Sequence, residues 1–278
     1  MNQSKKIKLA ITVTSIDALS KAFVVLRGFE ESIIKAAELG YDGVELAVKH
    51  PDDIKDIDLS RILSQNNMEV SSISTGLVYA QNGYMFTEPD DEKRGKAIKL
   101  YKELIDMASD FGQIVNIGLL RGYIGDKDPV ETETKFIAVA RELCSYAEKK
   151  GVTIILEPVN RYEIDFINSV EEGVKLLEKI GFPNLKLMPD VFHMNIEDRT
   201  IGGELAKHIK HAGYIHLADS NRLAPGWGHT DFDDIFKHLK MADYKGWLSV
   251  EVFPKPTPME AATQAVRFLK PYFEEYNR

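Results

Sequence analysis

The feature that most constrains this chain is a regular alternation of short apolar runs with longer amphipathic segments. Eight apolar runs occur, at residues 8–13, 43–48, 70–75, 115–119, 153–159, 185–191, 214–218 and 248–253. Their continuous apolar character is typical of strands buried on both faces, as in a parallel sheet. Eight strands alternating with helices predict a closed (β/α)8 TIM barrel. A doubly wound open sheet is the alternative, but no G-x-G-x-x-G turn supports it.

Six amphipathic segments between these runs are predicted helices. They span residues 30–39, 92–111, 130–150, 169–180, 231–241 and 258–272. Gly40, Gly151 and Gly181 each follow one of these segments shortly before the next apolar run, which is the usual place for a helix-ending glycine. Ser169, with Glu172 three residues later, is typical of a capping box. The chain therefore has the element pattern of an α/β protein.

Length and composition fit one barrel domain over residues 1–278, because barrels of roughly 250 residues form single domains. Basic residues number 35 and acidic residues 43, and the net charge of −8 disfavours nucleic acid as a partner. The single cysteine, Cys144, allows no disulfide within the chain, which fits a reducing compartment. The apolar run near the N-terminus is too short for a membrane span. We expect a soluble cytoplasmic protein that binds no membrane.

Polar residues mark the ends of the last four predicted strands. Glu157, Asp190, His216 and Glu251 each lie one strand–helix unit from the next. Function in such barrels collects at the carboxyl ends of the strands, so we expect the four side chains to meet there. A buried polar residue is unremarkable by itself, but three acids brought together repel one another unless a cation neutralises them.

One imidazole and three carboxylates form a ligand set in which oxygen predominates. Such a set suits Mn²⁺, Mg²⁺ or Co²⁺ better than a thiolate-rich zinc site does, although Zn²⁺ is also compatible with it. We therefore expect one divalent metal ion, with Mn²⁺ favoured.

Several sequence motifs carry a resemblance to a known family. They are EPVNRYE (157–163), PDVFHMNIED (189–198), HLADSNRLAPGWG (216–228) and the final VE (250–251), with GYDGVELA (40–47) also fitting. Together they resemble the xylose isomerase-like sugar isomerase/epimerase superfamily. The nearest pattern is that of the ketose 3-epimerases of the tagatose/psicose type and related sugar-phosphate epimerases.

The resemblance implies a role for each site residue. It implies that Glu157, Asp190, His216 and Glu251 hold one divalent metal. It also implies that Glu157 and Glu251 exchange the C3 proton of a ketose or ketose phosphate, through an enediolate whose charge the metal stabilises.

The resemblance further implies that Glu163, His193 and Arg222 contact substrate hydroxyls. Arg121 could meet an anionic group of the substrate or pair with a nearby acid. Leu217, Ala218 and Asp219 depart from the tripeptide usual in epimerases of free ketohexoses. The sequence therefore leaves open whether the substrate is a sugar or a sugar phosphate.

Other chemistries compete with epimerisation. An aldose–ketose isomerase or an inosose dehydratase of the same superfamily would use much the same ligands. A metal phosphodiesterase of the endonuclease IV type would use His193 as a ligand as well. That chemistry needs further histidines where the second and third strands end, and residues 45–47 and 74–76 supply none.

Two further expectations concern the loops and the assembly. The connection over residues 14–29 is long for a βα loop, and Phe23 and Arg27 in it are expected to form part of a lid. Barrels of this kind often pair through their helices, so we expect a homo-oligomer, either a dimer or a tetramer.

Overall fold

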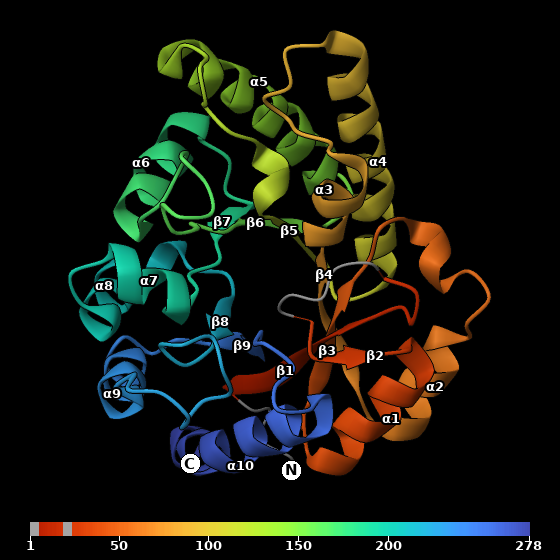
Figure 1. Ribbon diagram of the computed structural model, residues 1–278, viewed down its shortest axis with the longest axis vertical. Helices are drawn as coiled ribbons and strands as arrows, with labels where there is room; N and C mark the ends of the chain where they lie inside the picture. Colours follow the sequence, from red (N-terminus) through yellow and green to blue (C-terminus); the bar gives the residue numbers. More distant parts are fainter. Residues whose placement is uncertain (1–5, 19–23) are drawn as a thin grey trace.

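A computed structural model describes residues 6–18 and 24–278, and its strands form one parallel sheet surrounded by helices (Figure 1). The strands are β1 (Ile7–Thr14), β2 (Leu26–Arg27), β3 (Gly43–Ala47), β4 (Glu69–Ser74), β5 (Ile114–Ile117), β6 (Thr153–Leu156), β7 (Leu185–Leu187), β8 (Ile215–Leu217) and β9 (Gly246–Val250). Each of the eight predicted runs overlaps one of these strands, and the two-residue β2 is an addition beside β1.

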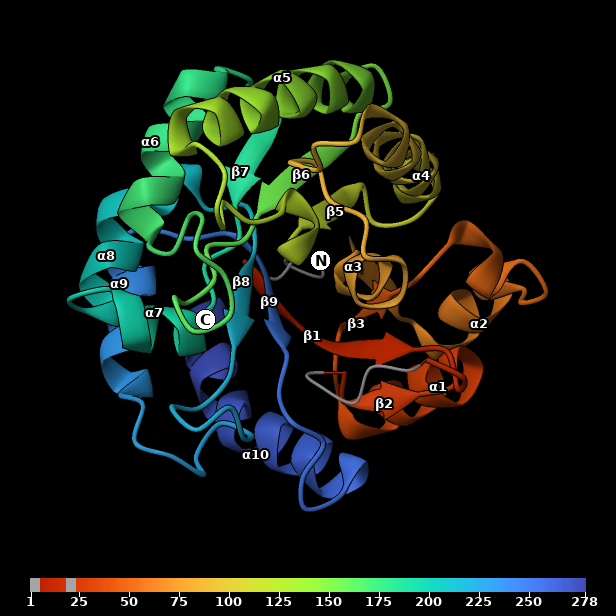
Figure 2. The same ribbon diagram turned by 45° about the horizontal axis from the view of Figure 1, so that its top comes forward.

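The sheet closes into a barrel. Its strands follow the order β7-β6-β5-β4-β3-β1-β9-β8, and every pairing is parallel. Two isolated parallel bridges, Leu187 with Ala212 and Asp190 with His216, join the two ends of this path. Figure 2 shows the resulting ring of strands with the helices outside it. The predicted barrel is confirmed, and the second bridge already links two candidate site residues.

The helices are more numerous than the sequence pattern predicts. They are α1 (Phe29–Leu39), α2 (Leu59–Asn66), α3 (Gly76–Asn82), α4 (Asp91–Asp110), α5 (Pro129–Glu148), α6 (Val170–Ile180), α7 (Val191–Glu197), α8 (Ile201–His208), α9 (Phe232–Met241) and α10 (Pro258–Asn277). Short 3₁₀ turns cover η1 (Pro51–Ile54), η2 (Leu119–Arg121) and η3 (Ile209–His211). The six predicted helices are confirmed. The four that the pattern misses have only seven or eight residues each, too few to show a clear helical period.

The predicted helix ends are also found. Ser169 and Glu172 form the capping box of α6, in which each side chain accepts a hydrogen bond from the other residue's backbone N–H. Gly40 and Gly181 end α1 and α6 with positive φ angles of 95° and 77°, a left-handed conformation that costs glycine least. After each of these helix ends, only a few residues separate the helix from the next strand.

Several strands end earlier than predicted, and for β6 and β7 the sequence gives the reason. The sequence predicts strands over 153–159 and 185–191, but β6 stops at Leu156 and β7 at Leu187. Proline lacks a backbone N–H to donate to a neighbouring strand, and Pro158 and Pro189 follow these ends closely. Glu157 and Asp190 consequently lie in the connections just beyond the strands.

The expected lid is only partly described. Phe23 lies outside the described residues. Arg27 belongs to β2, and its Nη1 donates a hydrogen bond to the carbonyl of Ala18 at 2.5 Å.

Over the described ranges, no helix combines the length and apolar character needed to cross a membrane.

Candidate metal centre

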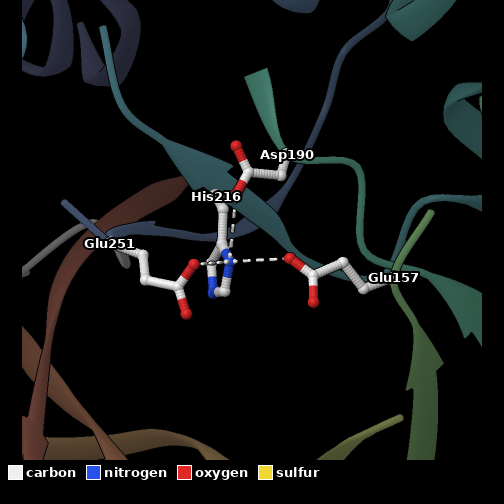
Figure 3. A group of neighbouring side chains, drawn as sticks. All are labelled: Glu157, Asp190, His216 and Glu251. Carbon is white, nitrogen blue, oxygen red and sulfur yellow. Dashed lines mark ion pairs between the residues drawn. The ribbon is translucent and has the colours of Figure 1, made fainter. Parts of the chain in front are cut away.

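Four polar side chains converge at the carboxyl end of the barrel (Figure 3). Glu157 follows β6, Asp190 precedes α7, His216 lies within β8 and Glu251 follows β9. One potential ligand atom from each lies within 4.8 Å of the others. The structure thus brings together all four residues that the sequence predicts as metal ligands.

His216 shows most directly that these residues fit a cation. Its Nδ1 is buried and has no hydrogen-bond partner among the described residues. It lies 3.4 Å from Glu251 Oε2, 3.5 Å from Glu157 Oε1 and 3.6 Å from Asp190 Oδ2. A nitrogen without a partner, facing three carboxylate oxygens, is the arrangement expected of a metal ligand set.

Two of the carboxylates near His216, those of Glu157 and Asp190, differ in their proton affinity. Burial is the main cause that raises the pKa of Glu157 to about 7; His216 opposes this shift, and Glu251 adds to it. Burial also acts to raise the pKa of Asp190, but the nearby charges of Arg222 and the two histidines outweigh it and lower that pKa. Glu157 can therefore exchange a proton near neutral pH, whereas Asp190 stays ionised.

Arg222 is buried against two of the four candidate ligands. Its Nη1 donates to Asp190 Oδ2 at 2.5 Å, and its Nη2 donates to Glu251 Oε2. The guanidinium also lies over the Phe192 ring, 4.9 Å from the ring centroid. Burial by itself would lower the pKa of Arg222. The nearby carboxylates, chiefly that of Asp190, have the larger combined effect and raise that pKa. This permanent cation offsets part of the negative charge of the cluster.

The loop that carries Arg222 is held by Asp219. The carboxylate of Asp219 accepts hydrogen bonds from the backbone N–H groups of Ser220, Gly226 and Thr230. Arg222 itself has a positive φ of 61°, which is uncommon outside glycine. Asp219 therefore organises the loop, and the loop in turn directs Arg222 at the cluster.

His193 lies beside the four ligand candidates with one ring nitrogen turned toward them. Asn160 Oδ1 accepts from the Tyr162 backbone N–H, so Asn160 Nδ2 is the donor to His193 Nδ1, at 2.8 Å. Because Nδ1 accepts, the proton of the neutral ring is on Nε2, which lies 3.8 Å from Glu157 Oε1. Burial lowers the pKa of His193 to about 4. The ring is thus a neutral donor aimed at the site.

Glu163 is the most exposed of the predicted site residues. Its Oε1 accepts a hydrogen bond from Asn160 Nδ2 at 2.9 Å, and its side chain is 30% exposed. Burial is the main cause that raises its pKa. Asn160 therefore positions both Glu163 and His193, two of the three residues that the resemblance assigns to the substrate.

The structure corrects the expectation for Arg121. Its guanidinium is fully buried and donates to the backbone carbonyls of Gly118, Glu157, Phe166 and Ile167. The contact with Glu157 is to its carbonyl, at 2.6 Å, and not to its carboxylate. These four hydrogen bonds tie the connections after β5 and β6 together. Arg121 supports the loop that holds Glu157 and is not placed to contact substrate.

The sequence pattern misses one acid, Glu45 in β3. It is fully buried, and its Oε2 lies 2.9 Å from His216 Nε2, on the far side of the ring from the cluster. The signal was present, because Glu45 is a charged residue inside the apolar strand GVELA. The pattern of strand-end residues does not include it, because Glu45 lies two residues before the end of β3.

Comparisons with known proteins agree with this geometry. The model of the xylose isomerase-like TIM barrel family matches residues 33–272. L-ribulose 3-epimerase of Methylomonas sp. (strain DH-1) is 32% identical over 229 residues, which cover 81% of this chain and 79% of that protein. D-psicose 3-epimerase of Ruminiclostridium cellulolyticum is 29% identical over 232 residues, covering 80% and 77%. The crystal structure of D-allulose 3-epimerase from Methylomonas sp. with D-allulose superposes with a TM-score of 0.82 at 26% identity, covering 96% of this chain and 98% of that one.

Proposed function

The chain belongs to the xylose isomerase-like TIM barrel family and is a sugar isomerase or epimerase, and we propose that it inverts C3 of a free ketose. One observation carries the choice of epimerisation. Glu157 and Glu251 approach His216 Nδ1 from opposite sides, so two carboxylates face each other across the candidate metal position (Figure 3). Inversion needs one group to remove a proton and another to return it on the opposite face.

Glu157, Asp190, His216 and Glu251 would hold one divalent metal ion, and Mn²⁺ is the proposed ion. His216 Nδ1 and the carboxylate oxygens around it supply the donors, and their predominance of oxygen favours Mn²⁺ over Zn²⁺. When bound, the metal acts as a Lewis acid that polarises substrate oxygens and lowers the barrier to removing the C3 proton.

Glu157 and Glu251 would move the proton. Their role rests on position, because burial raises the pKa of Glu157 to about 7 only while no cation is bound, and a bound divalent cation would lower it. Arg222 donates a hydrogen bond to Glu251 Oε2 and so holds that carboxylate in place. In one direction Glu251 accepts the C3 proton and Glu157 donates one to the opposite face. In the reverse direction the roles exchange.

His193, Glu163 and Arg222 would orient the sugar. His193 presents Nε2–H to a substrate oxygen, because Asn160 occupies its other nitrogen. Glu163 supplies an acceptor for a hydroxyl, since one of its carboxylate oxygens is held by Asn160 and the side chain is partly exposed. A donor and an acceptor fixed by the same amide suit adjacent hydroxyl groups.

We propose an unphosphorylated substrate. The two buried arginines nearest the site are occupied, since Arg121 donates to backbone carbonyls and Arg222 donates to two carboxylates. A phosphate would therefore have to displace existing ion pairs. The relatives also carry the names of epimerases of free sugars, L-ribulose and D-psicose. We therefore expect a ketopentose or ketohexose.

The broader expectations remain proposals. We propose one barrel domain over residues 1–278, a cytoplasmic location, a homo-oligomer (dimer or tetramer) and no nucleic-acid partner. The phosphodiesterase alternative has little support. Among the described residues, His50 is the histidine nearest in sequence to the end of β3. Its imidazole accepts from the Asp52 backbone N–H and lies 3.4 Å from Glu103.

The decisive experiment is incubation of the enzyme with ketopentoses, ketohexoses and their phosphates in deuterated water with Mn²⁺. Deuterium at C3 together with the C3 epimer is the expected result for a free ketose. Exchange at C1 or C2 with an aldose product would instead identify an aldose–ketose isomerase. Phosphodiester cleavage without sugar exchange would overturn the proposal.

Two variants test the paired carboxylates. Glu251→Gln removes a ligand and a proton carrier, and we expect turnover to be lost. Glu69→Gln is the matched control, because Glu69 begins β4 at the opposite end of the barrel and forms only a partly exposed pair with Lys8. Activity that survives Glu251→Gln would show that the assigned role is wrong.

A further inference from the structure

Glu45 is the fifth acidic residue of the site, and its position beyond His216 has a consequence for metal binding. It lies in the middle of β3, and its side chain is fully buried in the barrel. Its Oε2 contacts His216 Nε2 at 2.9 Å, whereas the cluster faces His216 Nδ1. The imidazole therefore stands between Glu45 and the candidate metal position.

The direction of each hydrogen bond around Glu45 can be assigned. Tyr214 Oη donates to Glu45 Oε2 at 3.0 Å, and this carboxylate oxygen also accepts from His216 Nε2 at 2.9 Å. Ser71 Oγ lies 2.7 Å from Tyr214 Oη and also donates a hydrogen bond to the Val44 carbonyl at 3.1 Å. Tyr214 and His216 therefore both donate to Glu45 Oε2, and Ser71 contacts Tyr214 without touching His216.

This network determines which ring nitrogen of His216 carries the proton and which one is left unprotonated. A proton held on Nε2 by Glu45 leaves Nδ1 of the neutral ring as the acceptor. Nδ1 is also the buried atom without a hydrogen-bond partner among the described residues. Since a hydrogen-bonded carboxylate raises the basicity of an imidazole ligand, Glu45 makes Nδ1 a stronger donor to a cation.

The burial of the Glu45 carboxylate also supports a cation at this site. His216 is the basic side chain in contact with it, and its other oxygen, Oε1, is buried with no hydrogen-bond partner in the described ranges. A buried carboxylate so placed is unfavourable unless a positive charge lies close by. A divalent cation on the other face of the imidazole supplies that charge.

We infer that Glu45 is a positioning residue that fixes the Nε2–H tautomer of His216 and raises the affinity of the site for a divalent cation. This inference rests on the metal site of the proposed function. Glu45 touches neither the candidate metal position nor the place of the substrate, so it acts through His216 alone.

The test is a calorimetric titration of metal-free protein with Mn²⁺. For Glu45→Gln, which keeps the shape and removes the charge, we expect binding about 10- to 100-fold weaker than wild type. Ser71→Ala is the matched control, because it removes a buried hydroxyl of the same network that does not contact His216, and we expect a change of less than about threefold. At saturating Mn²⁺ the activity of Glu45→Gln should largely return, since the residue does not touch substrate.

The possible outcomes separate the inference from its premise. Wild-type protein that binds no divalent cation would refute the metal site itself. Wild-type protein that binds Mn²⁺, with Glu45→Gln binding equally well, would refute the role of Glu45 alone. A purely structural role would lower the Tm of the metal-free protein and leave the Mn²⁺ affinity unchanged.

A second measurement uses the wild-type protein and needs no folded Glu45 variant. Long-range ¹H–¹⁵N correlation spectra of the Mg²⁺-loaded protein report which nitrogen of His216 carries the proton, with the resonances assigned by their loss in His216→Asn. We expect a protonated Nε2 and an unprotonated Nδ1. A proton on Nδ1 would overturn the inference.

Discussion

Replacement of Arg121 by lysine separates a structural arginine from a substrate-binding one. Lysine keeps the positive charge that an anionic substrate group would need. It cannot replace the guanidinium geometrically, because its three N–H groups radiate from one nitrogen, whereas Arg121 donates from Nε, Nη1 and Nη2. The carbonyls that Arg121 contacts belong to two different connections, Gly118 in one and Glu157, Phe166 and Ile167 in the other.

The magnitude follows from the four hydrogen bonds that Arg121 makes. Hydrogen bonds that involve a charged donor contribute about 1.5–3 kcal/mol each, and a lysine at this position loses at least two of them. The expected decrease in the free energy of unfolding is therefore about 3–6 kcal/mol. For a chain of this length that corresponds to a Tm at least about 6 °C lower.

Thermal unfolding followed by circular dichroism measures the change, together with kcat and KM on the identified ketose. We expect a lower Tm and a lower kcat, because the loop that carries Glu157 loses its support. Arg161→Lys is the control. Arg161 pairs with Glu197 at 2.7 Å while 60% exposed, and such pairs contribute no more than about 1 kcal/mol. An unchanged Tm with a raised KM for Arg121→Lys would show that this reasoning is wrong and that Arg121 contacts substrate.

Three further predictions concern pH, metal and packing. Burial raises the pKa of Asp198 to about 7, so its contribution to stability is full below about pH 4 and is lost as the pH rises through 7. Between pH 5 and pH 8 the free energy of unfolding of Asp198→Asn, measured by urea titration, should rise by about 1–2 kcal/mol relative to wild type, after allowance for solvent screening. The same pH dependence of stability in both proteins would contradict this. Mn²⁺ at 100 times its Kd should stabilise the protein by about 2.7 kcal/mol in a thermal shift assay, a chelator should reverse the shift, and His216→Asn should abolish it. Gly43→Ala should cost about 1–3 kcal/mol, because a Cβ there would lie 2.6 Å from the Glu69 carbonyl oxygen, whereas Gly95→Ala in α4 meets nothing within 4 Å and should leave the Tm unchanged or raise it.

The sequence predicts the barrel and the positions of the candidate ligands well. Runs that are apolar throughout require burial on both faces, and their alternation with helices leaves a closed parallel sheet as the main solution. Because parallel strands that follow one another end at the same edge, Glu157, Asp190, His216 and Glu251 could be placed together without a structure. The short helices α2, α3, α7 and α8 escaped prediction for want of periodicity.

The partners of the buried polar side chains could not be predicted in the same way. Arg121 contacts carbonyls 36 to 46 residues away, and Glu45 contacts a histidine 171 residues away. Local patterns depend on neighbours two to four residues apart and therefore appear in the sequence. The orientation of a guanidinium or carboxylate inside the barrel depends on which atoms the closed sheet brings within about 3 Å.

The sequence by itself therefore determined the α/β barrel and one candidate ligand from each of its last four strand–helix units. Only the tertiary structure decided that Arg222 pairs with Asp190 and Glu251, that Arg121 supports a loop, and that Glu45 lies behind His216. The physical reason is that burial is a property of each segment, whereas a hydrogen bond requires two groups whose distance is set by the closure of the whole barrel.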